Sequence, residues 1–456
     1  MSSLFGCIPT GQAAFGLLFI AFFIFRYLRT FVGVYANLTY KPIPVRDNPT
    51  YGPQDFTVII PTTFKNPAEL TACVKSILNA RPAQIIIVTS NQNVDHVKAL
   101  CRLQSFNVRV IGVERLNKRV QMVAAIQEVR TKLIVFADDD VFWNSHRFLH
   151  YMAAAFENDN VGAAGPRQRL RRSEAPSLWS YLGTSYLERR VFNNLATIAI
   201  DGSISTLSGR TSVYRAKILQ DPSFLLEFLN DYYRGQLLNS DDDKCLTRWV
   251  YSHGREITIQ SEPMATLETN LEEGPKYIEQ CFRWQRARFR GNFLVMSTAD
   301  YWYKKHLWGF YYIYATQFFQ SAVLNDLLLG TLLYLWLSGS RWRADIIYAF
   351  IGFTLFMKQI KMIAHFRKYP SDMKYIPAGI LFSYYHSWIF WKSLFSLSNV
   401  NWDGKDLKQL EKTRAEGPAV VPMLKEAITK TRPYKETTPG RLMSGEDYFA
   451  AAAILA

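Results

Sequence analysis

The chain has 456 residues, more than one typical domain, and 49% of them are hydrophobic. A mean hydropathy of −0.06 excludes a protein made mostly of membrane-spanning segments, so the apolar stretches must be balanced by a sizeable polar domain. The net charge of +15 suits an anionic lipid surface or an anionic substrate such as a nucleotide diphosphate. Nucleic acid is disfavoured as a partner, because the sequence has neither zinc-finger spacing nor an RNA-binding aromatic motif.

Residues 1–40 predict a membrane anchor. Ala13–Phe25 is an unbroken apolar run that Phe31–Tyr35 extends, and about 20 residues are needed to span a bilayer. A cleaved signal peptide is disfavoured, because a basic n-region and a small-residue cleavage site are both missing. Arg26 and Arg29 follow the apolar run, so the positive-inside rule puts the chain from about residue 40 in the cytosol.

Residues 41–275 predict an α/β domain with a mainly parallel sheet. Short apolar strands are expected at 56–61, 84–89, 108–113 and 133–137, with helices at 67–80 and 117–130 between them. Such alternation is typical of parallel strands joined by helical crossovers. Ligands bind beyond the carboxyl ends of strands in these sheets, so functional residues should directly follow the strands.

Residues 301–400 predict three membrane segments, at 307–337, 346–363 and 375–397, followed by a polar tail at 401–456. Three simple spans would put that tail outside, together with Arg341 and Arg343. A hairpin within 307–337 would return the tail to the cytosol, although each half would be short for a span. One segment is alternatively re-entrant or interfacial, so the topology stays open. The intramembrane Asp326, Lys358 and Lys361 are expected to pair inside the bundle or to lie at the interface.

A first acidic cluster, FADDDV, spans Phe136–Val141 directly after a predicted strand. A helix cap or a solvated loop would explain one aspartate, but three such carboxylates are costly there without a partner. Asp138 and Asp140 can face one way, with Asp139 opposite. Two carboxylates so placed would hold a hard divalent ion that bridges substrate phosphates. We therefore expect Asp138 and Asp140 to bind Mg²⁺ or Mn²⁺ and the donor diphosphate.

A second acidic cluster, SDDDKCLT, spans Ser240–Thr247 just before a predicted helix. Capping of that helix is the simpler explanation. In the functional interpretation, Asp243 or Asp242 is a general base that deprotonates an attacking hydroxyl. The metal at the first cluster would then stabilise the leaving diphosphate.

A third motif, QCFRW, spans Gln280–Trp284 within a basic and aromatic stretch at 276–300. The stretch predicts an amphipathic helix at the membrane interface. Its arginines can face a diphosphate while its tryptophan faces an acceptor sugar, so the interfacial and functional interpretations are compatible.

These three motifs, in this order and followed by apolar segments, resemble the processive family 2 glycosyltransferases. The resemblance is strongest to hyaluronan synthases and their fungal relatives, and it covers about residues 12–405. Fungal membrane polysaccharide synthases look closest because SGRTSVYR, at Ser208–Arg215, suits them. The resemblance implies a nucleotide-sugar-binding domain of the GT-A type plus transmembrane helices.

The resemblance also implies a role for each matching residue. Asp138 and Asp140 match the metal- and diphosphate-binding pair, and Asp243, with Asp242 beside it, matches the catalytic base. The remaining matches are Lys118 and Arg119 for the donor nucleotide, Gln280, Arg283 and Trp284 for closure over donor and acceptor, Ser208, Gly209 and Arg210 for an acceptor-side loop, and more weakly the NWDGK segment at 401–405.

The sequence departs from the family pattern after the first two strands. Pro61–Phe64 stands where the family commonly has Tyr-Asn-Glu, and Thr89–Asn91 where it often has an aspartate pair. An aspartate there usually contacts the base in that family. Uracil recognition is therefore less determined by the sequence than phosphate binding is.

The implied function is inverting transfer from a UDP-sugar to a growing polysaccharide, which then enters a channel formed by the apolar segments. A multi-pass protein of the plasma membrane with a cytosolic catalytic domain is expected; its oligomeric state is left open. One alternative is a non-processive transferase that glycosylates a lipid. The other is a transporter or scaffold whose path is marked by Asp326, Lys358 and Lys361.

Overall fold

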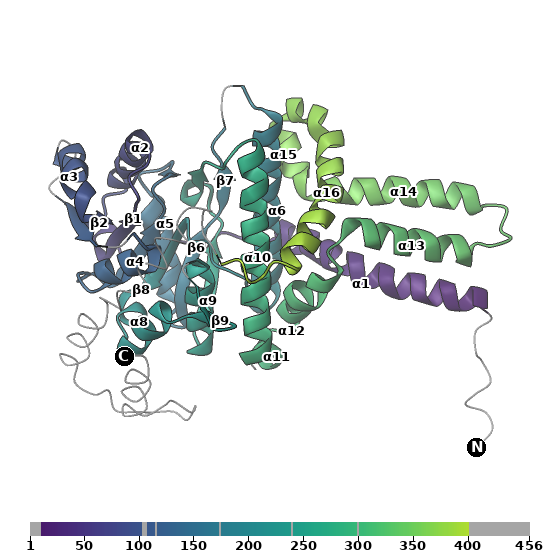
Figure 1. The fold of residues 1–456 in the computed structure, drawn as a ribbon, viewed down its shortest axis with the longest axis horizontal. Helices are drawn as coiled ribbons and strands as arrows, with labels where there is room; N and C mark the ends of the chain where they lie inside the picture. The colour runs from purple at the N-terminus through teal and green to yellow at the C-terminus, as the bar shows by residue number, and fades with distance from the viewer. Residues whose placement is uncertain are drawn as a thin grey trace, which may run out of the picture.

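The computed structural model describes residues 11–102, 107–114, 116–172, 175–238, 240–298 and 301–400. Figure 1 shows an α/β domain, a middle layer of helices, and a bundle of three long helices that projects from that layer. The middle layer contains α6 (Leu178–Asp201), α10 (Pro275–Thr298) and α16 (Ile376–Leu394). The bundle consists of α1 (Gly11–Thr39), α13 (Ala322–Trp336) and α14 (Arg343–Gln359).

The α/β domain is built on a seven-stranded sheet of order β11-β6-β8-β4-β1-β2-β3. β8 runs antiparallel to both of its neighbours, and the other adjacent strands are parallel. This confirms the expected mainly parallel α/β fold of the GT-A type. The strands are β1 (Phe56–Pro61), β2 (Gln84–Ser90), β3 (Val108–Val113), β4 (Leu133–Ala137), β6 (Val161–Pro166), β8 (Thr211–Arg215) and β11 (Glu256–Gln260).

Helices cover both faces of this sheet, and the alternation of side chains along each strand feeds two separate cores. Ile59 of β1 packs in one core with α4 (Lys118–Ile126), and its neighbours Val58 and Ile60 pack in the other with α2 (Pro67–Asn79). Burial on both faces explains why the central strands read as continuous apolar runs.

The remaining elements are short. β5 (Val141–Trp143), β12 (Leu267–Thr269) and β7 (Gln168–Leu170) form a three-stranded sheet, and β9 (Tyr232–Tyr233) pairs with β10 (Gln236–Leu237). The other helices are α3 (Val94–Arg102), α5 (Phe148–Ala153), α7 (Ala216–Leu219), α8 (Pro222–Leu229), α9 (Asp242–Ser252), α11 (Tyr301–Lys305), α12 (Leu307–Gly309) and α15 (Ile363–Lys368).

Two described helices are long and apolar enough to cross a membrane: Gly11–Thr39 and Arg343–Lys368. A third candidate is a helix pair, Leu307–Phe319 and Ala322–Trp336, which bends by 86° at its break. The expected span at 375–397 is not among these candidates. α16 packs instead against α10, where the rings of Phe289 and Phe390 lie 5.2 Å apart. The described residues thus contain two candidate spans, or three if the bent pair is one span.

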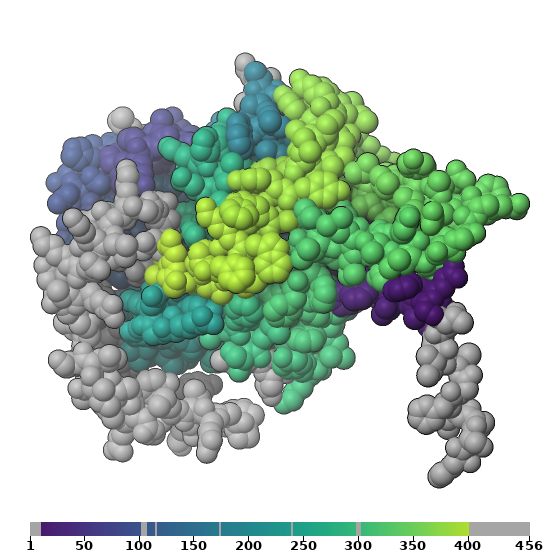
Figure 2. Space-filling view, turned by 45° about the vertical axis from the view of Figure 1, so that its right-hand side comes forward, coloured from purple at the N-terminus to yellow at the C-terminus, as the bar shows by residue number. Residues whose placement is uncertain are grey.

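The bent pair and α14 show how the apolar segments follow one another in space. Gln12 Nε2 donates to the carbonyl of Trp336 at 2.9 Å, so α1 begins where α13 ends. α14 then returns toward the α/β domain. At the end of the described chain, the carbonyl of Asn399 accepts a hydrogen bond from Arg290 Nη1 of α10 at 3.0 Å. In Figure 2 the last described residues, in yellow, reach from the bundle to the teal surface of the α/β domain. α13 and α14 therefore form one hairpin with Arg341 at its distant end.

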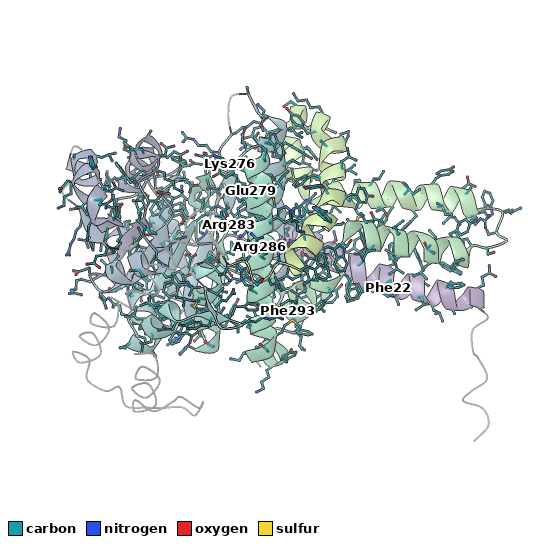
Figure 3. All side chains as sticks on the ribbon, in the orientation of Figure 1. Phe22, Lys276, Glu279, Arg283, Arg286 and Phe293 are labelled. Carbon is teal, nitrogen blue, oxygen red and sulfur yellow. The ribbon has the colours of Figure 1, made fainter. Side chains whose placement is uncertain are left out.

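The interior of the bundle is filled by side chains. Asp326 lies between two cations, 2.6 Å from Arg26 Nη2 and 2.9 Å from Lys358 Nζ, as expected of an intramembrane acid. Around this triad, Tyr27 and Met357 pack with phenylalanines that include Phe22 (Figure 3). Within the described residues these side chains occupy the centre of the bundle.

Candidate active site

The antiparallel strand β8 brings an acidic turn and a glycine loop together. β4 ends at Ala137, which pairs with Thr211 at the beginning of β8. The Asp138 amide donates to the Arg210 carbonyl at 3.0 Å, which extends this pairing by one step. The loop Ser208–Arg210 therefore lies beside the aspartates that follow β4, although 70 residues of sequence separate the two segments (208 − 138).

Lys118 joins the two acidic clusters. It begins α4, whose N-cap Asn117 accepts hydrogen bonds from two amides of the first turn. The Lys118 ammonium lies 2.8 Å from Asp138 Oδ1 and 3.2 Å from Asp242 Oδ2. Burial disfavours this charge, but the two carboxylates outweigh burial and raise the pKa of Lys118 above its usual value. The lysine is thus held charged between the ends of β4 and α9.

The three aspartates after β4 point in different directions. Asp139 accepts a short hydrogen bond from the Thr62 hydroxyl at the end of β1, away from Lys118. Burial, followed by the charge of Asp138, raises the pKa of Asp140 to about 7, while Arg210 acts in the opposite direction. Negative charge is therefore in excess beside Asp140, which a cation would relieve.

This acidic turn fits a divalent ion only in combination with a substrate. No group of three or more His, Cys, Asp or Glu side chains able to hold a metal occurs among the described residues. Asp138 and Asp140 would supply two oxygen ligands, and donor phosphates and water would have to supply the rest. That division is usual for Mg²⁺, which keeps several waters and binds through one or two carboxylates.

The second acidic cluster opens α9. Asp241, the N-cap residue of α9, has φ 64° and makes no capping hydrogen bond through its side chain, so capping does not explain this carboxylate. It pairs instead with Arg290 of α10, at 3.1 Å between Nε and Oδ2, and both side chains are buried. Burial, followed by the charge of Asp242, raises the pKa of Asp243 to about 6. Near neutral pH the group is still largely ionised and can accept a proton.

The loop before β8 packs against this helix. A Cβ on Gly209 would lie 3.4 Å from Lys118 Nζ and 3.5 Å from both Asp242 Oδ2 and Asp243 Cβ. Ser208 is buried, and its hydroxyl accepts from the Arg210 amide at 3.4 Å. The predicted acceptor-side loop therefore lies between the two acidic clusters.

Arg119 does not share the surroundings of Lys118. Its guanidinium is 2% exposed and lies 3.0 Å from Asp231 Oδ2. It also donates to the carbonyls of Phe228 and Ser240, at 2.7 and 2.8 Å. In the structure the Arg119 guanidinium therefore contacts the protein itself, and not the region around Lys118 where a donor contact was expected. Because successive helical residues point about 100° apart, the two members of the Lys-Arg pair face different regions.

The QCFRW motif lies on α10, between the α/β domain and the bundle. Figure 3 shows Arg283 and Arg286 in succession along this helix. The Trp284 ring stacks on Tyr186 of α6, with centroids 4.3 Å apart, and the Arg210 guanidinium lies 5.3 Å from the same tryptophan ring. Gln280 Oε1 is buried and has no hydrogen-bond partner within the described residues. Buried polar atoms are rarely left unpaired, so this atom is available to a ligand.

Several contributors were not foreseen. Tyr186 and Arg190 come from α6, and the positive charge of Arg190 acts on Asp243. Lys244 is buried and hydrogen-bonds Asn292 Oδ1 of α10 at 3.2 Å. Lys244 lies within the SDDDKCLT motif, and Arg190 belongs to a basic pair, Arg189–Arg190, in a long helix, whereas Tyr186 carried no signal in the sequence.

The predicted departures from the family pattern lie at the carboxyl ends of β1 and β2. Thr62 contacts Asp139, as described above, and Phe64 has a left-handed backbone with φ 59°. Asn91 follows β2 and leaves no space for a side chain at Gly112. The NWDGK segment at 401–405 lies outside the described residues, as does the polar tail.

Comparisons with known proteins agree with this geometry. Residues 53–287 match the family described as glycosyltransferase like family 2. A type 2 glycosyltransferase of Zymoseptoria tritici is 39% identical over 92% of this chain and 88% of the relative. One of Pyricularia oryzae is 34% identical over 85% of this chain and 81% of the relative.

One solved structure has a similar fold. The mannosyltransferase PcManGT of Pyrobaculum calidifontis, in complex with GDP-Man and Mn²⁺, has a TM-score of 0.51 at 14% identity and covers 81% of this chain and 98% of its own. That likeness concerns the fold alone. The family match and the fungal relatives show that the chain belongs to the family 2 glycosyltransferases, among the fungal type 2 glycosyltransferases.

Proposed function

We propose that the protein transfers a sugar from a UDP-sugar to a growing polysaccharide at the membrane surface, with inversion at the anomeric carbon. The observation that carries this proposal is Lys118, whose ammonium contacts Asp138 at 2.8 Å and Asp242 at 3.2 Å. This contact supports the proposal because it joins the turn after β4 to the beginning of α9, which carries Asp243, at the end of the sheet where ligands of such folds bind.

In this proposal Asp243 is the catalytic base. An acceptor hydroxyl attacks the anomeric carbon, its proton passes to Asp243, and the bond between that carbon and the diphosphate oxygen breaks, releasing UDP. Asp242 and Lys118 hold the site together, and the Lys118 ammonium favours the developing negative charge. A divalent ion held by Asp138 and Asp140 would supply further stabilisation of the leaving diphosphate.

The other predicted residues act around this centre. Gln280, with its unpaired buried oxygen, and Arg283 on α10 are proposed to close over the donor. Trp284, stacked on Tyr186, offers an aromatic face to the acceptor sugar. Ser208, Gly209 and Arg210 form the acceptor-side loop. Arg119 is proposed to act indirectly, by holding the chain at Ser240 that leads into α9.

A single transfer to a lipid acceptor is the second candidate. It is favoured by one observation: the centre of the α1, α13 and α14 bundle is filled by the Arg26–Asp326–Lys358 triad and by aromatic rings. Export of a polymer would need a path elsewhere, for example between copies of the chain. The proposed position is a cellular membrane, with the α/β domain on the cytosolic side.

The test is UDP release by the full chain in nanodiscs, measured against a panel of UDP-sugars with Mg²⁺ or Mn²⁺. Asp243→Asn should lower the rate about a thousandfold, the middle of the range for a general base, and leave UDP binding unchanged. Asp95→Asn, the same change at a side chain that is 96% exposed on α3, is the matched control. Retained turnover in Asp243→Asn would remove the base assignment, and the size of the product would separate polymer from single transfer.

A further inference from the structure

Four cations from four elements meet between the α/β domain and the bundle. They are Arg29 of α1, Arg189 of α6, Arg288 of α10, and Lys361, which lies between α14 and α15. The Lys361 ammonium and the Tyr312 hydroxyl both donate to Asn193 Oδ1, at 2.6 and 2.8 Å, and the Arg29 guanidinium lies 5.7 Å from the Tyr312 ring. Arg189 precedes Asn193 by one turn of α6, and the charges of Arg189 and Arg288 act on Lys361. We call these four residues the cationic junction. The site proposed above uses none of them.

The cationic junction has no acidic partner within the part of the chain that the structure describes. Its hydrogen bonds go to neutral groups: Arg29 to the Thr316 hydroxyl at 2.9 Å, Arg288 to Gln320 Oε1 at 2.9 Å and Lys361 to Asn193 Oδ1 at 2.6 Å. For Arg189, no hydrogen bond or ion pair is found there. All four side chains are half-buried, so solvent or a ligand can still reach them.

This arrangement differs from the rest of the bundle, where Arg26 and Lys358 share Asp326. Burial, followed by the charge of Arg29, lowers the pKa of Arg288 to about 10, so both effects disfavour its positive charge. Charges that are half-buried side by side need a counter-charge. Since the described residues supply none here, we look for the counter-charge in an anionic ligand.

We propose that the cationic junction binds the phosphate of a lipid-linked acceptor. This inference rests on the proposed transferase function and specifies its acceptor. Arginine suits the ligand because its planar fork matches phosphate oxygens in a bidentate manner.

The position of the junction points to a lipid as the carrier of that phosphate. Arg29 and Lys361 belong to the two candidate spans, so the bilayer is the nearest source of an anion. On α1, Leu28 and Phe31 flank Arg29 and are 40% and 47% exposed, which offers apolar surface to a hydrocarbon chain.

The junction also connects to the proposed active site. Arg288 interacts electrostatically with Tyr186, the residue that stacks on Trp284, and the Arg210 guanidinium lies 5.3 Å from the same tryptophan ring. The positive charge of Arg210 in turn favours the ionised form of Asp140. A phosphate at the junction would therefore leave the glycan or hydroxyl that it carries pointing toward Trp284 and the base.

The experiment measures binding of farnesyl phosphate and of farnesol to the full chain in phosphatidylcholine nanodiscs, by native mass spectrometry. We expect one farnesyl phosphate to bind at least about tenfold more tightly than farnesol, as for a few charge-assisted hydrogen bonds. Arg189→Gln should abolish that preference, and Lys361→Gln should do the same independently. Arg367→Gln, at an exposed cation on the same segment as Lys361, should leave it intact.

Arg189→Gln is the decisive variant, because it removes no hydrogen bond or ion pair of the described chain, and unchanged UDP binding will confirm its fold. Equal binding of farnesol and farnesyl phosphate, or a preference that survives both variants, overturns the proposal. Inorganic phosphate that binds as tightly as farnesyl phosphate would overturn the lipid assignment. Binding of an oligogalacturonate in place of farnesyl phosphate would replace the lipid with an acidic glycan. Farnesyl phosphate binding without any UDP binding would refute the proposed transferase function and leave the junction in place.

Discussion

The same residue types form two very different charge clusters in this protein. In the bundle, the single acid Asp326 is shared by Arg26 and Lys358, so each charge has a partner inside the chain. At the ends of β4 and α9, Lys118 pairs with Asp138 and Asp242, whereas Asp140 and Asp243 make no ion pair within the described residues. Saturated clusters stabilise a fold, whereas a cluster with excess charge leaves interactions for a ligand. The comparison teaches that imbalance, more than the presence of charge, marks the candidate site.

The strongest test of this contrast removes the cation that the two acidic clusters share, Lys118. Lys118→Met should lower the transfer rate about a thousandfold, as the loss of a single preorganised electrostatic contact can do. The physical reason is that Asp138 and Asp242 would then repel each other and the leaving diphosphate would lose a positive neighbour. UDP-release kinetics would show the loss, and Lys98→Met on α3 is the matched control. An active Lys118→Met would mean that the lysine is only structural.

The balanced cluster should respond in stability and much less in chemistry. Asp326→Asn leaves Arg26 and Lys358 facing each other without a counter-charge, which should lower the free energy of unfolding by about 3 kcal/mol. Thermal unfolding in nanodiscs measures this effect, while UDP affinity at low temperature should not change. A variant with normal stability and impaired transfer would instead indicate that Asp326 lies on a substrate path.

A smaller effect is expected where the unbalanced site meets the middle layer. Trp284→Leu removes the ring that contacts both Tyr186 and the Arg210 guanidinium. Aromatic and cation–π contacts are each worth about 1 kcal/mol, so the loss of both should lower transfer to the acceptor about thirtyfold. Donor hydrolysis in the absence of acceptor should change little. Equal losses in both reactions would place Trp284 at the donor and not at the acceptor.

The smallest predicted effect concerns the pH profile. The pKa of Asp243 is about 6, and a base must be ionised, so kcat/KM should rise with pH up to about 6 and then level off. The charge of Arg190 lowers this pKa, so Arg190→Gln should move the rising limb to higher pH. Measurement of kcat/KM between pH 5 and 8 checks both statements. An unmoved limb in Arg190→Gln would assign the titration to another group.

Local patterns in the sequence were sufficient for β1 to β4, whereas β6, β8 and β11 of the same sheet were not predicted. The runs at 56–61 and 133–137 are strands with the predicted bounds, because burial on both faces makes such strands continuously apolar. The edge strand at 108–113 also has the predicted bounds. The acidic turn directly follows β4 as expected, since ligand sites of parallel sheets lie at that end. Lys118, Asp138, Asp242 and Gly209 were all singled out before their proximity was known.

The tertiary structure alone decided which of these residues meet and how the apolar segments are arranged. Arg119 follows Lys118 directly, yet its burial against Asp231 depends on α8 and on the chain at Ser240. Whether 307–337 is one span or two depends on the 86° bend before α13, and hydropathy does not encode a bend. The cationic junction gathers residues 29, 189, 288 and 361, and such long-range proximity has no periodicity for a sequence to display. Sequence therefore determined the elements and the chemistry of their ends, and packing determined which charges are balanced.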